Sequence, residues 1–170
     1  RPMPPIVELR GVIKDYPLGR TTVHALRGVD LVIEKGEFTT IAGPSGSGKT
    51  TLLNMIGCVD VPTSGDVTVA GHATAKLGDN KLTDLRLHHI GFIFQTFNLI
   101  NVLDVAQNVA FPLLLQGGLS AAERDQRVAE LVERVGLTAQ LHQRPNELSG
   151  GQRQRVAIAR ALVTRPDIVL

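Results

Sequence analysis

The first third of the chain has the apolar, β-branched pattern of strands. Residues 6–33 are rich in β-branched side chains and are interrupted by a turn at 17–19, which predicts two or three strands. Two short apolar runs, 38–42 (FTTIA) and 90–95 (IGFIFQ), have the length and composition of buried strands. After the first of these runs, a Gly- and Ser-rich loop leads into a helix predicted over about 49–57.

From about residue 104 the apolar positions change to the spacing of helices. Ser120 and Glu123 fit the capping-box pattern S-x-x-E, which marks a helix start. Gly136 is a natural stop for that helix. Between them, apolar side chains recur on one helical face, namely Val128, Leu131, Val132 and Val135.

The order of the elements predicts an α/β protein. Further strands are predicted at 66–70 and from Asp167 onward, and a further helix runs from after Leu148 to about Thr164. Strands with a glycine-rich loop are thus followed by a block of helices and then by a return to the sheet. We expect one domain over 1–170, with its core at about 1–96 and 149–170 and a helical insert at about 97–148.

Composition excludes several classes of protein. Hydrophobic residues make up 43% of the 170 residues and charged residues 20%, which is ordinary for a globular chain and excludes a disordered one. The net charge of +2 gives no reason to expect a nucleic-acid partner. A single cysteine, Cys58, excludes an internal disulfide and suits a reducing compartment. The longest apolar run, Val109–Leu115, falls short of the about 20 residues that a membrane-spanning helix needs.

The glycine-rich loop predicts binding of nucleotide phosphates. Residues Gly43 to Thr50 fit G-x-x-x-x-G-K-[ST] at every fixed position, between an apolar run and a predicted helix. Glycines let successive N–H groups face phosphate oxygens, and the helix start adds its positive end. The Lys49 ammonium can reach the β- and γ-phosphates, and the Thr50 hydroxyl can bind Mg²⁺. This motif alone fits a small-molecule kinase, a GTPase and a transport ATPase equally well.

A second helix start follows at Leu148 to Gln152, which read LSGGQ. Ser149 is a good N-cap, and Gly150 and Gly151 leave the first N–H groups unobstructed. An ordinary helix cap with a glycine turn would have the same local sequence. Together with the first loop, however, the segment predicts a second anion site.

The two motifs together resemble the ATP-binding cassette (ABC) family, whose signature is LSGGQ. Residues 91–99 (GFIFQTFNL) are similar to a block in the macrolide-exporter and lipoprotein-releasing ATPases, to which a cell-division ATPase is closely related. Arg153 stands where many members have Gln. The resemblance covers nearly the whole chain. It implies a P-loop NTPase core with an N-terminal antiparallel β region and a helical insert.

The resemblance also implies roles for individual residues. Tyr16 matches an aromatic residue that stacks on adenine, with an ordinary strand-surface tyrosine as the alternative. Gln95 matches a glutamine whose amide oxygen binds Mg²⁺ or holds the attacking water, so Lys49 and Gln95 are the implied catalytic residues and Thr50 and Gln95 the implied Mg²⁺ ligands. The implied ATP site comprises Tyr16, Gly43, Pro44, Ser45, Gly46, Ser47, Gly48, Lys49, Thr50 and Thr51. The residues implied to bind the ATP of a second copy are Ser149, Gly150, Gly151 and Gln152.

For the whole protein, the resemblance implies the ATP-hydrolysing subunit or domain of a membrane transporter. Two copies would enclose two ATP molecules, and ATP-driven closure would act on membrane helices to export or extract a substrate. The implied cofactors are ATP and Mg²⁺. The implied partners are a second cassette and a permease subunit or fused membrane domain, at the cytoplasmic face of the membrane.

Two alternatives remain open at this point. One is a soluble ABC ATPase acting in DNA repair, on chromosomes, on ribosomes or in cell division, although the short spacing of the two motifs argues against the repair and chromosome types. The other is a regulator that binds ATP without hydrolysing it. In the family, the strand that begins at Asp167 continues to an Asp and a Glu that position Mg²⁺ and water. The chain is therefore expected to be truncated at its C-terminus and to bind Mg-ATP without turnover.

Other polar groups predict no separate chemistry. His88 and His89 have no second ligand cluster at a workable spacing and are expected to form a surface pair, and Cys58 is expected to be a small buried side chain. A basic run near the second motif is expected to be a solvated face or a set of ion-pair partners. It consists of Arg153, Arg155, Arg160 and Arg165.

Overall fold

The computed structural model describes residues 4–170, which form two compact units. The first unit ends at Arg86 and the second begins at Leu87. The predicted division into a core and a helical insert stays a prediction.

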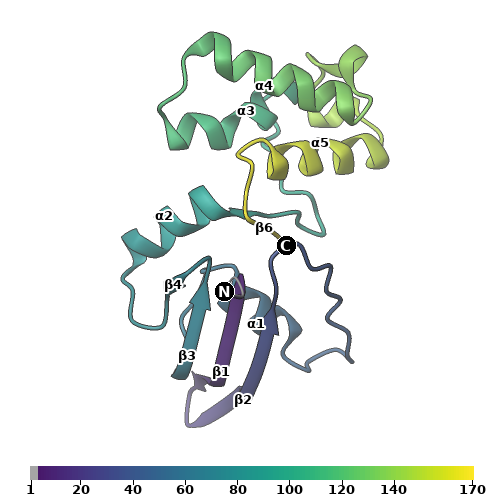
Figure 1. The fold of residues 1–170 in the computed structure, drawn as a ribbon. Coiled ribbons are helices and arrows are strands. Elements are labelled where there is room, and N and C mark those ends of the chain that lie inside the picture. The colour runs from purple at the N-terminus through teal and green to yellow at the C-terminus, as the bar shows by residue number, and fades with distance from the viewer. Residues whose placement is uncertain (1–3) are drawn as a thin grey trace. The chain divides into compact units, whose positions relative to one another are not determined.

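An antiparallel sheet is the main element of the first unit (Figure 1). Its strands are β1 (Val7–Leu18), β2 (Thr21–Ile33), β3 (Ser64–Val69) and β4 (His72–Ala73), in the order β2-β1-β3-β4. Alternate residues of β1, among them Val7 and Leu9, are buried, as expected for a sheet with one face on a core. The predicted antiparallel β region is therefore confirmed.

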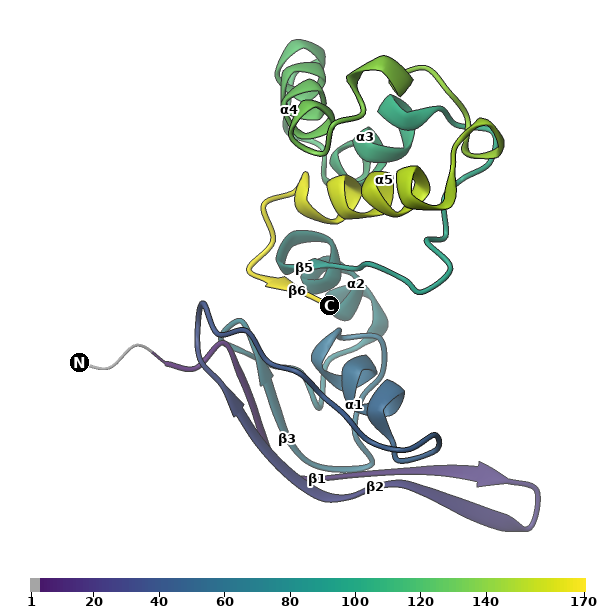
Figure 2. The same cartoon turned by 90° about the vertical axis from the view of Figure 1, so that its right-hand side faces the viewer.

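The β1–β2 hairpin continues past the rest of the sheet as a two-stranded arm (Figure 2). Strand β3 pairs with β1 only as far as Ile13, whereas β2 accompanies β1 to Leu18. Helix α1 (Lys49–Ile56) packs beside β2 and β3 and buries Met55 and Ile56. The arm thus carries the side chains at 14–18 beyond the four-stranded part of the sheet.

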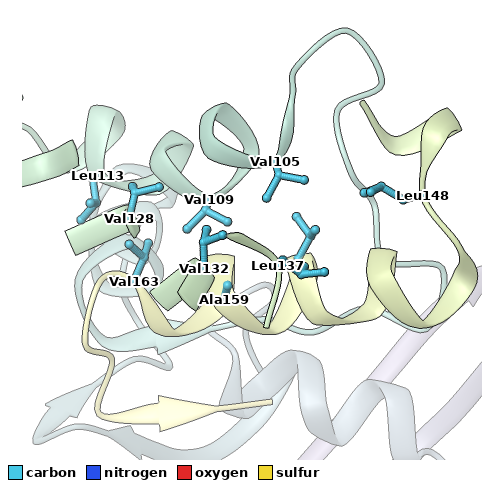
Figure 3. Close-up of a cluster of buried hydrophobic side chains, with 10 residues drawn as sticks. Val105, Val109, Leu113, Val128, Val132, Leu137, Leu148, Ala159 and Val163 are labelled. Carbon is cyan, nitrogen blue, oxygen red and sulfur yellow. The ribbon is translucent and has the colours of Figure 1, made fainter. Parts of the chain in front are cut away.

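Three helices form the core of the second unit: α3 (Val105–Gln116), α4 (Ala121–Arg134) and α5 (Gly150–Leu162). Short 3₁₀ helices at Thr138–Gln140 and Pro145–Glu147 connect α4 to α5. The predicted capping box of Ser120 and Glu123 is present, and the predicted apolar stripe of α4 faces the cluster. Figure 3 shows these buried side chains, which are Val105, Val109, Leu113, Val128, Val132, Leu137, Leu148, Val156, Ala159 and Val163.

A two-stranded parallel sheet completes the second unit. It pairs β5 (Ile90–Gly91) with β6 (Ile168–Val169), and the Ile93 N–H continues the pairing by donating to the Leu170 carbonyl at 2.8 Å. Helix α2 (Asp79–His89) begins in the first unit, where it buries Leu82 and Leu85, and its last residues lead into β5. Gly91 must be glycine, because a Cβ atom there would lie 2.3 Å from the Ala161 carbonyl oxygen.

Three predicted strands differ from the structure. Residues 38–42 form no strand, and Phe38 is 95% exposed. A strand is stabilised by hydrogen bonds to a neighbouring strand. In the part of the chain that the structure describes, neither sheet includes residues 38–42. The predicted strand at 90–95 is regular only over Ile90–Gly91. Strand β3 starts at Ser64, two residues before the predicted start, because Gly65 (φ 91°) fits a register shift opposite β1.

Candidate functional site

The loop before α1 has the backbone of an anion-binding turn. Gly46 (φ 78°) and Gly48 (φ 91°) adopt the left-handed conformation that favours glycine. Gly48 is also the last residue before α1, and a Cβ atom there would lie 2.6 Å from the Ala25 carbonyl oxygen of β2. The close approach to β2 therefore fixes where the loop ends and where the helix begins.

Helix α1 begins without a side-chain cap, in contrast to three other helices. Helices α3, α4 and α5 each have a reciprocal capping box that satisfies backbone N–H groups at their first turn. At α1 no side chain accepts a hydrogen bond from the first turn. The N–H groups of Lys49, Thr50 and Thr51 also have no carbonyl partner within the helix, because it only begins there. They are therefore available to an anion, which the positive end of the helix also attracts.

The Lys49 side chain folds back over this loop. Its ammonium donates to the carbonyls of Gly43 and Pro44, both at 2.7 Å, and more weakly to the Ser47 hydroxyl at 3.4 Å. The loop therefore holds a positive charge beside the free N–H groups of α1. Thr50 is exposed at the same helix start, where its hydroxyl oxygen is of the kind that Mg²⁺ prefers.

Tyr16 is held on the hairpin arm by a charged pair that the sequence analysis did not identify. Its hydroxyl donates to Asp60 at 3.0 Å, and Lys14 donates to the other oxygen of Asp60 at 2.8 Å and to the Val61 carbonyl at 2.7 Å. The Lys14 ammonium lies 5.0 Å from the centroid of the Tyr16 ring, a cation–π distance. Lys14 and Tyr16 are two residues apart on one strand, which was a usable signal, whereas nothing in the local sequence pointed to Asp60.

This contact changes the acidity of both partners. Burial raises the pKa of Tyr16, and the hydrogen bond to the Asp60 carboxylate raises it further. Burial also acts to raise the pKa of Asp60, but hydrogen bonds from Lys14, the Val61 N–H and Tyr16 outweigh it and lower that pKa. Asp60 is therefore ionised and orients the ring.

In the second unit, Ser149 and Gln152 cap helix α5 reciprocally. The Ser149 hydroxyl accepts from the Gln152 N–H at 3.2 Å, and the Gln152 side chain accepts from the Ser149 N–H at 2.8 Å. The predicted N-cap is thus confirmed, and the role of Gln152 could have been deduced from the S-x-x-Q pattern. A Cβ atom at Gly150 or Gly151 would meet nothing within 4 Å. The Ser149 O–H and two glycine N–H groups therefore remain able to donate outward.

Gln95 lies in a turn and not at the end of a strand as the sequence suggested. Regular pairing in β5 ends at Gly91, and the Phe97 N–H donates to the Phe94 carbonyl at 3.0 Å, which closes a four-residue turn around Gln95 and Thr96. Gln95 is exposed in this turn. A turn leaves the side chain free to reach a ligand.

The structure groups the predicted residues by unit. Tyr16 and the loop of residues 43–51 belong to the first unit, and Gln95 and residues 149–152 to the second. Within residues 4–170, no group of three or more His, Cys, Asp or Glu side chains could hold a metal ion. The pairing of Thr50 with Gln95 as Mg²⁺ ligands stays a prediction.

Two smaller expectations can also be compared with the structure. Cys58 is buried as expected, in a left-handed turn (φ 54°) just after α1, and burial raises its pKa to about 11. His89 is more than a surface histidine, because its Nδ1 lies 2.6 Å from the Asp167 carboxylate, and the backbone N–H of Asp167 donates to the His89 carbonyl. This contact joins the strand β5 region to the start of β6.

Comparison with protein families identifies the chain. The family described as ABC transporter matches residues 26–170. The chain belongs to the ABC transporter family. The family resemblance inferred from its motifs, the cassette fold which that resemblance implied, and the α/β class predicted from its element order are all confirmed. No helix in the described part of this cassette is long and apolar enough to cross a bilayer.

Known relatives of the cassette include the proteins of the expected subgroup. It is 49% identical to a lipoprotein-releasing system ATP-binding protein, LolD, from Anaeromyxobacter dehalogenans, with 98% of this chain and 70% of LolD aligned. It is 48% identical to a macrolide export ATP-binding/permease protein, MacB, from Rhodopseudomonas palustris, where 96% of this chain matches 25% of MacB.

A solved structure is also similar to the cassette. The ATP-binding cassette MJ0796 from Methanocaldococcus jannaschii superposes with a TM-score of 0.88 at 47% identity, over 96% of this chain and 72% of that one. That structure is a dimer in a post-hydrolysis state with ADP and inorganic phosphate bound.

Proposed function

We propose that this cassette binds Mg-ATP at residues 43–51 and that the intact protein, rather than residues 1–170 alone, hydrolyses it to drive a membrane transporter. The uncapped start of α1 carries this proposal, because the chain leaves N–H groups and the Lys49 ammonium together there while it caps α3, α4 and α5. A triphosphate would replace the carbonyl partners of Lys49 with charge-assisted hydrogen bonds, which are the stronger kind.

The remaining groups of the site hold and orient the nucleotide. The Tyr16 ring, fixed by Asp60 and Lys14, offers a surface on which adenine can stack. The Thr50 hydroxyl and the Gln95 amide oxygen would hold Mg²⁺, which neutralises phosphate charge when bound. Gln95, in its exposed turn, would also orient the attacking water. Phosphoryl transfer depends mainly on such positioning and charge stabilisation, so the roles assigned to Lys49 and Gln95 suit hydrolysis.

The proposed hydrolysis takes place in a dimer. Ser149, Gly150 and Gly151 would donate to the γ-phosphate held by a second copy, while Gln152 keeps Ser149 in place. The dimeric MJ0796 cassette with ADP and phosphate supports this arrangement. The name of MacB, an export ATP-binding/permease protein, supports a permease subunit or fused membrane domain as the other partner. We propose that the cassette lies at the cytoplasmic face of the membrane.

Nucleotide titration of Lys49→Ala tests the ATP site. Hydrogen bonds to charged groups contribute about 1.5–3 kcal/mol each, so affinity for ATP should fall roughly tenfold to hundredfold. Lys81→Ala is the matched control, because Lys81 is exposed on α2 and lies outside the loop. Equal affinities for wild type and Lys49→Ala would remove Lys49 from the site.

Gel filtration tests the dimer separately. Ser149→Arg in the intact protein should leave ATP binding by the monomer unchanged and abolish ATP-dependent dimerisation, because the larger side chain fills the position of the partner's phosphate. A variant that dimerises and hydrolyses ATP normally would contradict the role of Ser149 across the dimer.

A further inference from the structure

The backbone just after Gln95 is held in an unusual conformation. Phe97 (φ 64°) and Asn98 (φ 46°) are consecutive non-glycine residues in the left-handed region, which L-amino acids rarely adopt. The Asn98 N–H donates to the Thr96 carbonyl at 2.8 Å, and the Thr96 hydroxyl bonds to the Asn98 side chain at 2.8 Å. These local contacts leave the carbonyls of Phe97 and Asn98 without partners in the loop itself.

One arginine of α5 binds both of those carbonyls. The Arg160 guanidinium donates to the Phe97 carbonyl at 2.6 Å and to the Asn98 carbonyl at 2.7 Å. The fork of an arginine suits two adjacent acceptors, and a lysine ammonium cannot reproduce that geometry. Arg160 is half-buried, and burial lowers its pKa. Within the described residues, the partners of its guanidinium are these two backbone carbonyls, whereas the sequence predicted a solvated charge or an ion pair.

Gln95 lies between two anchored points of the chain. Two residues before it, Ile93 pairs with Leu170 at the end of β6, and two residues after it, Phe97 is bound by Arg160. Farther along, the buried Asn108 side chain fixes the Ile100 backbone through both its N–H and its carbonyl. Of these contacts, only the one from Arg160 joins the Gln95 turn to α5, the helix that Ser149 caps.

We propose that Arg160 is a positioning residue for hydrolysis, which sets the Gln95 turn and ties it to the signature helix α5. The inference rests on the proposed function of Gln95. Arg160 is eleven residues after Ser149, or about three helical turns. A shift of α5 at its Ser149 end is therefore transmitted through one rigid helix to the Gln95 turn. Because Arg160 binds backbone carbonyls of the Gln95 turn, its loss should affect turnover more than ATP affinity.

Hydrogen exchange of the Gln95 turn tests the positioning without relying on activity. In the intact protein, Arg160→Ala should speed exchange of the amides at 94–99, while those of α3 and α4 remain protected. Arg155→Ala is the matched control, since Arg155 lies on the same helix and donates to the Val135 carbonyl at the end of α4. Unchanged exchange at 94–99 in Arg160→Ala would overturn the inference.

Steady-state kinetics then separate positioning from general stability. Arg160→Ala should lower kcat about tenfold to hundredfold, the loss expected when a reacting group is misplaced by about 1 Å, with little change in the Kd for ATP. Arg160→Lys keeps the charge and the aliphatic stem and should recover only part of kcat, and it serves as the test if Arg160→Ala does not fold. Parallel losses of kcat, ATP affinity and stability, or full activity in Arg160→Lys, would overturn a positioning role.

The two proposals fail in different ways. Intact wild-type protein that binds ATP but shows no turnover, alone or with its membrane partner, would contradict the proposed function. The exchange experiment would still decide whether Arg160 holds the turn. Normal wild-type turnover that Arg160→Ala retains in full would contradict the positioning inference alone.

Discussion

Gly46 and Gly48 offer a test of how the phosphate loop is built. Both have positive φ angles, 78° and 91°. Alanine at either position would be held in the left-handed conformation, which costs about 1–2 kcal/mol of folding free energy. Only Gly48 has a second restriction. A Cβ atom there would lie 2.6 Å from the Ala25 carbonyl oxygen and 3.2 Å from the Leu26 side chain, whereas one at Gly46 would meet nothing within 4 Å.

The two substitutions should therefore differ in size. Gly46→Ala should lower the free energy of unfolding by about 1–2 kcal/mol. Gly48→Ala adds overpacking against the β2 backbone, typically another 1–3 kcal/mol, and displaces the start of α1. Because the displaced start of α1 carries the N–H groups of the ATP site, ATP binding should also fall more in Gly48→Ala than in Gly46→Ala.

Denaturant unfolding and nucleotide titration, done on both variants, measure the two effects. Gly48→Ala is expected to lose more stability and more ATP affinity than Gly46→Ala. Equal losses would show that backbone conformation alone matters and that the contact between Gly48 and Ala25 is relaxed in solution. A greater loss in Gly46→Ala would refute the assignment of the close contact to Gly48.

Other consequences can be measured directly. Tyr16→Ala should weaken ATP and GTP binding to a similar degree, by about 1–3 kcal/mol in a nucleotide titration, because a ring face stacks on any base. Leu137→Ala, in the buried cluster of the second unit, should cost about 2–5 kcal/mol of unfolding free energy by denaturant titration, whereas Leu114→Ala, at a residue that is 54% exposed, should change it by less than about 0.5 kcal/mol. Since the pKa of Asp60 is lowered on folding, its contribution to stability is present above the ordinary value of 3.8 and is lost as the pH falls through the lower folded pKa. Acid unfolding of Asp60→Asn should lack that part of the pH dependence, and an identical acid profile would argue against the Lys14–Asp60–Tyr16 contact.

The parts of the fold that sequence predicted well are those set by local signals. The helix over Ala121–Arg134 follows from a capping box and an apolar stripe, and both are present in the structure. The start of α1 after Gly48 and the start of α5 after Ser149 follow from the positions of glycine and serine. In each case the residues that define the helix lie within it or next to it in the sequence. The pattern can therefore be recognised without knowledge of the rest of the fold.

The errors occurred where a structure depends on partners distant in sequence. Residues 38–42 have strand composition, yet a strand forms only when another strand pairs with it, and composition does not name the partner. Gln95 was placed at the end of a strand for the same reason, whereas pairing with β6 supports regular strand only as far as Gly91. Asp60 was missed because it meets Tyr16 across 44 residues of chain.

The arginines show why a basic run is a poor guide to what its members do. Arg160 was expected to be solvated or ion-paired, yet it binds two carbonyls of left-handed residues 62 and 63 positions away. Arg86 acts in the same way in the first unit, where its guanidinium donates to the carbonyl of Cys58, another left-handed residue. In both cases a turn leaves a carbonyl that its own segment does not satisfy, and an arginine on a helix donates a hydrogen bond to it. An arginine that donates to backbone carbonyls thus stabilises both the turn after α1 and the turn after Gln95. At Gln95 the stabilised turn carries a residue proposed to act in hydrolysis, and there the arginine becomes relevant to function.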